Sequence, residues 1–250
     1  MASHCSNLIE LLSLQMQEQA DSIAIKDSSS ALTYRDTFLY ARKAAAILQQ
    51  NGIRSGNRIV CISRKNTESM VCFYAILMCG GIPVMIDRED GVATNREKIK
   101  EVKSAGIILD KGLEMPLDEF PGNSIFYFSD LVSLDLPAPG DVLLDPVSYP
   151  ETCYILLTSG TTGKPKAVQL SHENVMHYTY SIYHKLGAPQ HVRAAHVSTF
   201  AADLGLTNTL VALVSGGMLR IINKTEATDP AVFNKIIEED AISLLKITPS

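Results

Sequence analysis

The longest uncharged run in this sequence, from Ser69 to Ile86, restricts the fold more than any other feature. Its length approaches the roughly 20 apolar residues that a membrane-spanning helix needs. However, Gly80, Gly81 and Pro83 interrupt the run SMVCFYAILMCGGIPVMI. Glycine favours sharp turns, and proline cannot continue a helix. The run therefore predicts a short helix, a turn and a buried strand, and we expect no membrane partner.

The same design recurs later in the chain. Residues 74–86 read YAILMCGGIPVMI and residues 210–222 read LVALVSGGMLRII. Each segment predicts an apolar helix end, a Gly-Gly turn and a strand. Helical and strand patterns alternate between these segments, which is typical of an α/β fold with a mainly parallel sheet. We predict two similar, mainly parallel sheets flanked by helices.

The order of the segments predicts two subdomains. A first α/β subdomain, with N-terminal helices and a polar loop, is expected over residues 1–190. The start of a second α/β subdomain is expected over residues 191–250. Because the sequence stops directly after a strand pattern, we expect the second subdomain to be incomplete and the chain to be truncated.

Composition restricts the class of protein and its compartment. Hydrophobic residues make up 46% and charged residues 20% of the chain, which is normal for a globular protein with a core. The net charge is −5 and both signs are mixed along the chain, so we expect no nucleic-acid partner. The five cysteines form no Cys-x-x-Cys motif, and the N-terminus lacks a signal-peptide pattern. We predict a cytoplasmic protein with reduced thiols.

A glycine- and hydroxyl-rich loop follows the apolar strand pattern CYILLT. Residues 158–168 read TSGTTGKPKAV. Glycines allow close approach of the backbone to a ligand, and successive backbone N–H groups form a concavity that favours anions. Lysine adds a compact positive charge. The loop predicts phosphate binding, and the alternative interpretation is a flexible surface turn.

Several commoner motifs are excluded by their spacing. A Walker A loop needs four residues between its glycines, but only two separate Gly160 from Gly163. No GxGxxG or GxSxG occurs, so neither a dinucleotide fold nor a nucleophile-elbow hydrolase is supported. The segment HENVMH at 172–177 is one residue too long for the zinc motif HExxH, and we predict no metal ligands.

The segment TSGTTGKPKAV closely resembles the signature loop of the adenylate-forming (AMP-binding) enzyme superfamily. LTYRD with its following helix, YAILMCGGIPVMID and LSHENV resemble other segments of that family. The resemblance covers residues from about 8 to 250 and is closest to the N-terminal part of a nonribosomal peptide synthetase adenylation domain.

The resemblance implies a reaction. A small carboxylic acid attacks the α-phosphate of ATP, with Mg²⁺, and forms an acyl-adenylate. The acyl group then passes to a thiol, either the phosphopantetheine of a carrier-protein domain or coenzyme A (CoA). Alternative interpretations are an acyl-CoA ligase or a fatty acyl-AMP ligase, and a non-catalytic homologue or inactive fragment.

The resemblance also implies the residues of the phosphate site. Lys166 and Thr162 are the candidate catalytic residues. Ala167 stands where the family usually has glycine, and Lys164 is expected to be an exposed loop lysine. The residues expected to hold the phosphates are Thr158, Ser159, Gly160, Thr161, Thr162, Gly163 and Lys166.

In peptide-synthetase adenylation domains, a Phe-Asp-x-Ser segment lines the acid pocket, and its aspartate pairs with the substrate ammonium group. The matching segment here is Phe200, Ala201, Ala202 and Asp203, with alanine in the aspartate position. A buried ammonium group without a counter-charge costs several kcal/mol. We therefore expect a keto, hydroxy, aryl or fatty acid, or an amino acid bound differently. A shift in register that lets Asp203 serve is the alternative.

His196 precedes this segment and is a candidate lining residue of the pocket. The other interpretation is a core histidine bonded to backbone. The family segments with the magnesium-binding glutamate, the ribose-binding aspartate and the C-terminal lysine do not occur in these 250 residues. We expect little or no adenylation by this chain alone.

Overall fold

The computed structural model describes residues 5–132, 142–159 and 165–247. Contacts divide the chain into two compact units that interleave along the sequence. Unit 1 comprises Met1–Phe38, Lys65–Thr67 and Glu173–Ser250, and unit 2 comprises Leu39–Arg64 and Glu68–His172.

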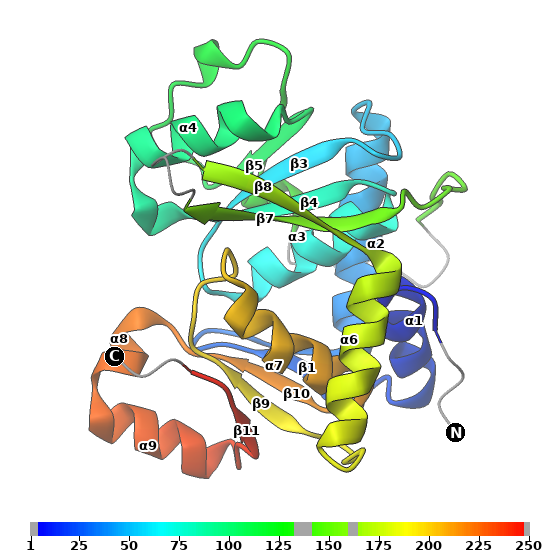
Figure 1. Ribbon diagram of the computed structural model, residues 1–250, viewed down its shortest axis with the longest axis vertical. Coiled ribbons are helices and arrows are strands. Elements are labelled where there is room, and N and C mark those ends of the chain that lie inside the picture. The colour runs from blue at the N-terminus through cyan, green and yellow to red at the C-terminus, as the bar shows by residue number, and fades with distance from the viewer. Residues whose placement is uncertain (1–4, 133–141, 160–164, 248–250) are drawn as a thin grey trace. The chain divides into compact units, whose positions relative to one another are not determined.

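Unit 2 is built on a sheet with the order β6-β5-β3-β4-β7-β8 (Figure 1). Neighbouring strands run parallel except for β7 and β8, which are antiparallel. Its strands are β3 (Arg58–Ser63), β4 (Ile82–Asp87), β5 (Gly106–Leu109), β6 (Ser124–Tyr127), β7 (Thr152–Ser159) and β8 (Pro165–Ser171). Its helical elements are most of α2 (Tyr34–Gln50), α3 (Thr67–Met78), η1 (Arg88–Asp90), α4 (Val92–Val102), η2 (Leu117–Glu119) and α5 (Phe128–Leu131).

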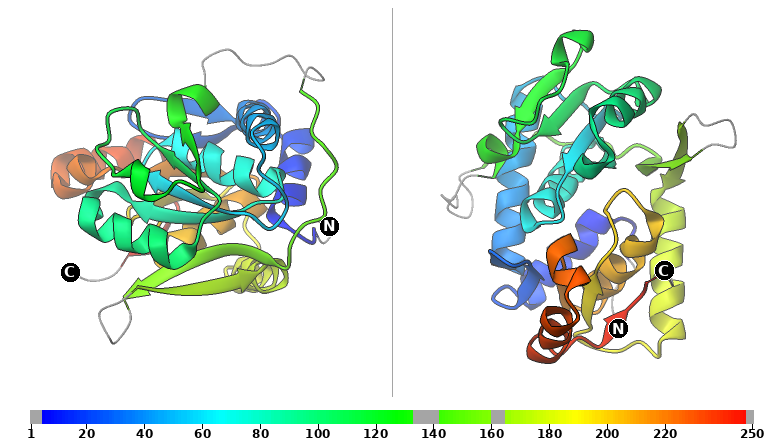
Figure 2. Two further views of the ribbon diagram at one scale, coloured as in Figure 1. Left: turned by 90° about the horizontal axis from the view of Figure 1, so that it is seen from above. Right: turned by 90° about the vertical axis from the view of Figure 1, so that its left-hand side faces the viewer.

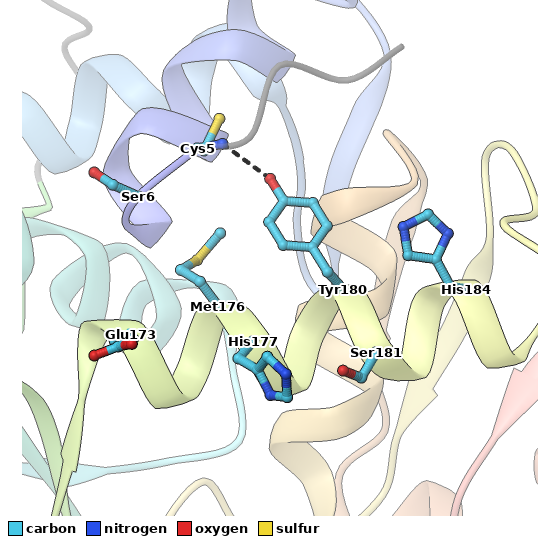
Figure 3. A pocket seen from close by; sticks show the side chains of 8 residues that line it. All are labelled: Cys5, Ser6, Glu173, Met176, His177, Tyr180, Ser181 and His184. Carbon is cyan, nitrogen blue, oxygen red and sulfur yellow. Dashed lines mark hydrogen bonds between the residues drawn. The ribbon is translucent and has the colours of Figure 1, made fainter.

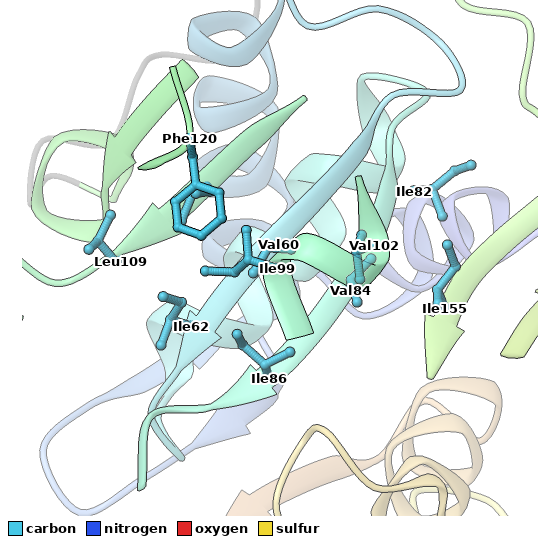
Figure 4. Packing of buried hydrophobic residues seen from close by; sticks show 11 residues of the cluster. Val60, Ile62, Ile82, Val84, Ile86, Ile99, Val102, Leu109, Phe120 and Ile155 are labelled. Carbon is cyan, nitrogen blue, oxygen red and sulfur yellow. The ribbon is translucent and has the colours of Figure 1, made fainter. Parts of the chain in front are cut away.

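A cluster of buried aliphatic side chains holds the unit 2 sheet together (Figure 4). The central strands are apolar on both faces, as expected for parallel strands covered by helices. Burying one such side chain stabilises the fold by about 1.5–3 kcal/mol. Its members are Val60, Ile62, Ile82, Val84, Ile86, Ile99, Val102, Ile107, Leu109, Phe120 and Ile155. Since Ile155 belongs to β7, the cluster anchors the strand that leads into the predicted phosphate loop.

Unit 1 is built on a second sheet, with the order β11-β9-β10-β1-β2. Its neighbouring strands run parallel except for β1 and β2. Figure 2 shows α6 and α9 on opposite sides of β11. The strands are β1 (Ile23–Lys26), β2 (Ala31–Thr33), β9 (Arg193–His196), β10 (Met218–Ile221) and β11 (Leu244–Leu245). The helices are α1 (Leu8–Glu18), α6 (His172–Lys185), α7 (Asp203–Val214), α8 (Lys224–Thr228) and α9 (Pro230–Glu239).

Both predicted Gly-Gly turns are confirmed, and each connects a helix to a strand of its own unit. Gly80 and Gly216 have φ of 76° and 63°, in the region that favours glycine. A Cβ on Gly81 would lie 2.9 Å from Cγ2 of Ile76, and a Cβ on Gly217 would lie 2.0 Å from the carbonyl oxygen of Val192. The run Ser69–Ile86 therefore folds as most of α3, a turn and β4. Within the described ranges, no helix is long and apolar enough to cross a membrane.

The predicted fold class is confirmed, because both sheets are mainly parallel and carry flanking helices. Each sheet has one antiparallel pair at an edge, formed by β1 and β2 or by β7 and β8. The strands β1 and β2 pair within the sheet that continues after residue 190. The subdomain boundary at residues 190/191 stays a prediction.

Candidate functional site

The β7–β8 hairpin positions both ends of the predicted phosphate loop. Figure 2 shows the two strands running side by side. Thr158 pairs with Lys166 and Ser159 pairs with Pro165, as the last pairs of the ladder. The Thr158 hydroxyl donates to the Lys166 carbonyl over 3.5 Å. Thr158 and Lys166 are therefore brought together, both at least partly exposed, at the base of the loop.

The remaining predicted phosphate ligands fall largely outside the described residues. Those outside are Gly160, Thr161, Thr162 and Gly163, with the neighbouring Lys164. The structure describes the backbone of Ser159 as the end of β7 but not its side chain. The roles of all these residues stay predictions.

The buried half of β7 keeps the hairpin in place. Ile155 pairs with Val84 of β4 and is 1% exposed. Cys153 is fully buried, and burial raises the pKa of its thiol to about 12. The thiol is therefore protonated at neutral pH and unreactive, although it lies near the loop in sequence.

The predicted acid-pocket segment lies in unit 1, between β9 and α7. Phe200 is 2% exposed, and its ring centroid lies 4.3 Å from that of His196. Ala201 and Ala202 are partly buried, and Ala202 caps α7 with an extended backbone and no side-chain hydrogen bond. Asp203 opens α7, but its side chain is outside the described part. The structure therefore brings Phe200 and His196 into direct contact, and their role in a pocket stays a prediction.

His196 is a fully buried, neutral imidazole. Burial lowers its pKa to about 4, and the bond to the Gly205 carbonyl opposes this only in part. Its Nδ1 donates to the Gly205 carbonyl over 3.1 Å and lies 3.3 Å from the Thr209 hydroxyl. Its Nε2 and the Ser198 hydroxyl have no partner among the described residues. The bond to a backbone carbonyl agrees with the interpretation of His196 as a core histidine.

Gly205 makes room for this buried group. A Cβ at this position would lie 2.3 Å from Cε1 of His196 and 2.4 Å from the Ser198 hydroxyl. Real Cβ atoms do not approach so closely, so any larger residue would displace the imidazole. Glycine at the start of α7 is thus a packing requirement of His196.

A cluster of charges at the carboxyl end of the unit 2 sheet was missed at the sequence level. Nε of Arg64 lies 2.6 Å and Nη1 of Arg88 lies 2.9 Å from the same Asp110 oxygen, Oδ2. The three residues follow the ends of β3, β4 and β5. The available signal was a charged residue directly after each of three apolar strand patterns, because the carboxyl ends of neighbouring parallel strands meet at one edge.

A separate cavity of about 440 Å³ lies on unit 1 (Figure 3). Tyr180 accepts a hydrogen bond from the backbone N–H of Cys5 over 3.1 Å at one side of it. None of the predicted site residues lines this cavity. The lining residues are Cys5, Ser6, Glu173, Met176, His177, Tyr180, Ser181 and His184.

Among the described residues, no group of three or more His, Cys, Asp or Glu side chains could hold a metal ion. All five cysteines fall within the described ranges and are free.

A comparison with known protein families identifies the family of this chain. Residues 12–250 match the AMP-binding enzyme family. The chain belongs to this family. Formation of an acyl-adenylate is the general reaction of the adenylation domains in this family.

Curated relatives of this AMP-binding chain include peptide synthetases. Bacitracin synthase 3 of Bacillus licheniformis is 30% identical over 245 residues, and the match covers 96% of this chain and 4% of that protein. Cyclosporin synthetase simA of Tolypocladium inflatum is 26% identical over 250 residues, which are 98% of this chain and 2% of that protein. The chain therefore spans a small part of each of these relatives.

Solved structures show the same fold. The N-terminal subdomain of Klebsiella oxytoca NpsA, in complex with 3-hydroxybenzoyl-AMSN, matches with a TM-score of 0.81 and 19% identity. That match covers 96% of this chain and 59% of the other. NpsA-ThdA, an artificially fused adenylation–PCP di-domain from the same organism, has a TM-score of 0.83 and 19% identity. That match covers 98% of this chain and 48% of the di-domain chain.

Proposed function

We propose that this chain is the ATP-phosphate-binding part of a peptide-synthetase-like adenylation domain that activates a carboxylic acid. The observation that carries the proposal is the β7–β8 hairpin, which places Thr158 opposite Lys166 at the base of the TSGTTGKPK loop. Family membership over residues 12–250 and the peptide-synthetase relatives support it.

The proposed phosphate site follows from the chemistry of the loop. The Lys166 ammonium group supplies positive charge at the base of the hairpin, and the Thr158 hydroxyl can donate to a phosphate oxygen. The remaining ligands are proposed from the family match. Gly160, Thr161, Thr162 and Gly163 lie outside the described residues, and so does the side chain of Ser159.

The proposed catalytic contribution is positioning and charge neutralisation. Transfer at the α-phosphate needs the acid carboxylate in line with the leaving pyrophosphate, and fixed donors at the developing charge. Lys166 and Thr162 are assigned these contacts. Mg²⁺ usually binds through substrate phosphates with one or two carboxylates, so we propose that it accompanies ATP and neutralises phosphate charge.

The proposed substrate is an acid without a conventionally placed α-amino group. The segment Phe200–Asp203 offers Ala201 where a carboxylate would pair with an ammonium group. His196, with a pKa of about 4, is neutral at pH 7 and adds no negative charge. A keto, hydroxy, aryl or fatty acid fits this apolar segment better than an amino acid.

The proposed acceptor is the phosphopantetheine thiol of a carrier-protein domain. The support is the relationship to peptide synthetases and to a fused adenylation–PCP protein, each over most of this chain. Because the chain spans only 59% of the matched NpsA subdomain structure, we propose that these 250 residues bind phosphate but catalyse little acid-dependent exchange by themselves.

An equilibrium titration of the chain with a non-hydrolysable ATP analogue and Mg²⁺ tests the phosphate site. We expect Lys166→Gln to weaken binding about tenfold, because one charge-assisted contact contributes about 1.5 kcal/mol. Lys185→Gln, which removes an exposed lysine at the end of α6, is the matched control. Equal affinities for the Lys166→Gln variant and the wild type would contradict the proposal.

A pyrophosphate-exchange screen over amino, keto, hydroxy, aryl and fatty acids tests the substrate class, using the longest native polypeptide that carries this sequence. We expect exchange with acids that lack an α-amino group. Strong exchange with an ordinary α-amino acid that disappears in Asp203→Ala would show that Asp203 serves as the counter-charge and would overturn the expectation.

A further inference from the structure

The charge cluster at the carboxyl end of the unit 2 sheet is a preorganised pair of arginines. Asp110 is 14% exposed and contacts both guanidinium groups through one oxygen, while Arg64 is 51% and Arg88 is 35% exposed. One carboxylate against two guanidinium groups leaves an excess positive charge. Each guanidinium uses one N–H group on Asp110 and retains further donors for an anion.

The strand register places this cluster on the same edge as the phosphate hairpin. Val84 pairs with Ile155, so three residues further on Asp87 is level with Thr158. Asp87 also pairs with Ser63, and the next residues along are Arg88 and Arg64. Neighbouring strands lie about 4.8 Å apart, so Arg88 begins one strand away from the end of β7 and Arg64 two strands away. Both guanidinium groups lie on Asp110, which follows β5, so the cluster is on the same edge as the hairpin but on the β5 side of β3 and β4.

The acidic groups nearby are already engaged. The carboxylate of Asp87 accepts the backbone N–H of Glu89 over 2.8 Å. Asp90 is paired with Lys98 at 2.5 Å, and Asp130 with Lys111 at 2.6 Å. Lys98 and Lys111 therefore balance the charges of Asp90 and Asp130. Asp87 keeps its negative charge beside Arg88, so an anion would be bound by the guanidinium N–H donors and not by a net positive charge of the edge.

We propose that Arg64 and Arg88, held by Asp110, form a phosphate-binding subsite at the carboxyl edge of the unit 2 sheet. This inference rests on the proposed function and deepens it, because it adds a second phosphate contact to the edge that carries Thr158. The bound phosphate comes from one of two sources that share this chemistry, either the polyphosphate of ATP or the phosphate of the phosphopantetheine acceptor. Arginine suits both, since its planar guanidinium group matches phosphate geometry.

Titrations with inorganic pyrophosphate and with 4′-phosphopantetheine test the subsite and separate its sources. Arg64→Gln and Arg88→Gln should each lower the affinity for one of the two ligands about tenfold, because each removes a charge-assisted contact. Loss of pyrophosphate binding identifies ATP as the source, and loss of 4′-phosphopantetheine binding identifies the acceptor. Pantetheine, which lacks the phosphate, should not distinguish the variants from the wild type.

Two further variants separate a binding role from a structural one. Arg96→Gln is the matched control, because Arg96 is 43% exposed and forms a similar ion pair with Glu119 at 2.6 Å on α4. It should bind both phosphates like the wild type. Asp110→Asn removes the competing negative charge and should tighten phosphate binding about threefold or more, with the opposite sign to the arginine variants.

The proposal is overturned if the wild type binds neither phosphate ligand, or if the arginine variants bind both ligands like the wild type. It is also overturned if Arg96→Gln weakens binding as much as Arg64→Gln does, or if Asp110→Asn weakens binding. These outcomes are distinguishable from failure of the Lys166 test. Weaker ATP-analogue binding in Lys166→Gln, with unchanged phosphate binding in the arginine variants, would contradict only the subsite. Weaker phosphate binding in the arginine variants, with unchanged binding in Lys166→Gln, would contradict only the proposed loop contact.

Discussion

Burial sets the charge of His196. The imidazole has no solvent contact, its Nδ1 donates to the Gly205 carbonyl, and its pKa is lowered from 6.5 to about 4. The folded protein therefore carries a neutral group where the unfolded chain carries an ordinary histidine. A single residue in the acid-pocket segment thus couples the stability of unit 1 to pH.

We predict that the free energy of unfolding decreases as the pH falls from about 6.5 to about 4. The unfolded chain takes up a proton on His196 in this window and the folded chain does not, so protonation favours unfolding. The loss amounts to about 3 kcal/mol. Urea unfolding across this pH range should show a flatter profile for His196→Gln. His177→Gln, at an exposed position on α6, should keep the wild-type profile. Equal slopes for all three proteins would contradict the prediction.

A buried ion network joins helices α8 and α9 to the unit 1 sheet. Arg220 of β10 is 4% exposed, and its Nε lies 2.9 Å from Oδ2 of Asp240. Its Nη2 lies 2.7 Å from Oε1 of Glu226. Lys26 of β1 contacts the other Asp240 oxygen at 2.6 Å. Asp240 follows α9 directly, so this one carboxylate connects the end of the helix to two strands.

We predict that Asp240→Asn destabilises the protein by about 3 kcal/mol or more, because it leaves the buried Arg220 without one of its counter-charges. The measurement is the free energy of unfolding in urea at pH 7. Lys235→Ala is the matched control on α9, since Lys235 is 70% exposed and pairs with Glu239 on the surface. This control should change stability by less than about 1 kcal/mol. Similar losses in the free energy of unfolding for Asp240→Asn and Lys235→Ala would show that the buried network stabilises the protein no more than a surface ion pair does.

The edge strand β8 is an element that the local sequence pattern does not reveal. The strand β8 lacks a local strand pattern, because PKAVQLS contains lysine, proline and glutamine. In the structure Val168 and Gln169 are exposed. An edge strand needs no second buried face, and lysine and proline on it discourage pairing with other chains. Its formation depends on pairing with β7, and no local pattern in PKAVQLS reveals that pairing.

The buried cysteines report on the protection of unit 2, which contains all four of them. Cys61, Cys72, Cys79 and Cys153 are buried, and burial raises the pKa of each thiol, to about 11 for Cys79. Cys5 is partly exposed. The thiolate is the reactive form, so the four buried thiols react only when the structure opens.

We predict that a thiol reagent modifies no more than Cys5 promptly in the native protein, and all five cysteines in urea. Modification of the buried thiols should be slower by about a hundredfold or more, as an opening free energy of about 3 kcal/mol implies. The rates are measured by absorbance, with peptide mapping to assign the sites. Cys5→Ser is the control and should abolish the prompt phase. Rapid modification of Cys72 or Cys153 in the native protein would contradict the buried arrangement.

The sequence by itself determined the class of fold, and it predicts a phosphate-binding loop. Apolar segments separated by glycine pairs can be buried only as helix–turn–strand units, and two glycines with hydroxyl and lysine side chains suit a phosphate. Only the tertiary structure decided which distant segments meet. The pairing of β1 with β10, the contact between His196 and Phe200, and the meeting of Arg64 and Arg88 on Asp110 all depend on strand order. Strand order follows from packing of the whole chain, because residues far apart in sequence become neighbours only when the core forms.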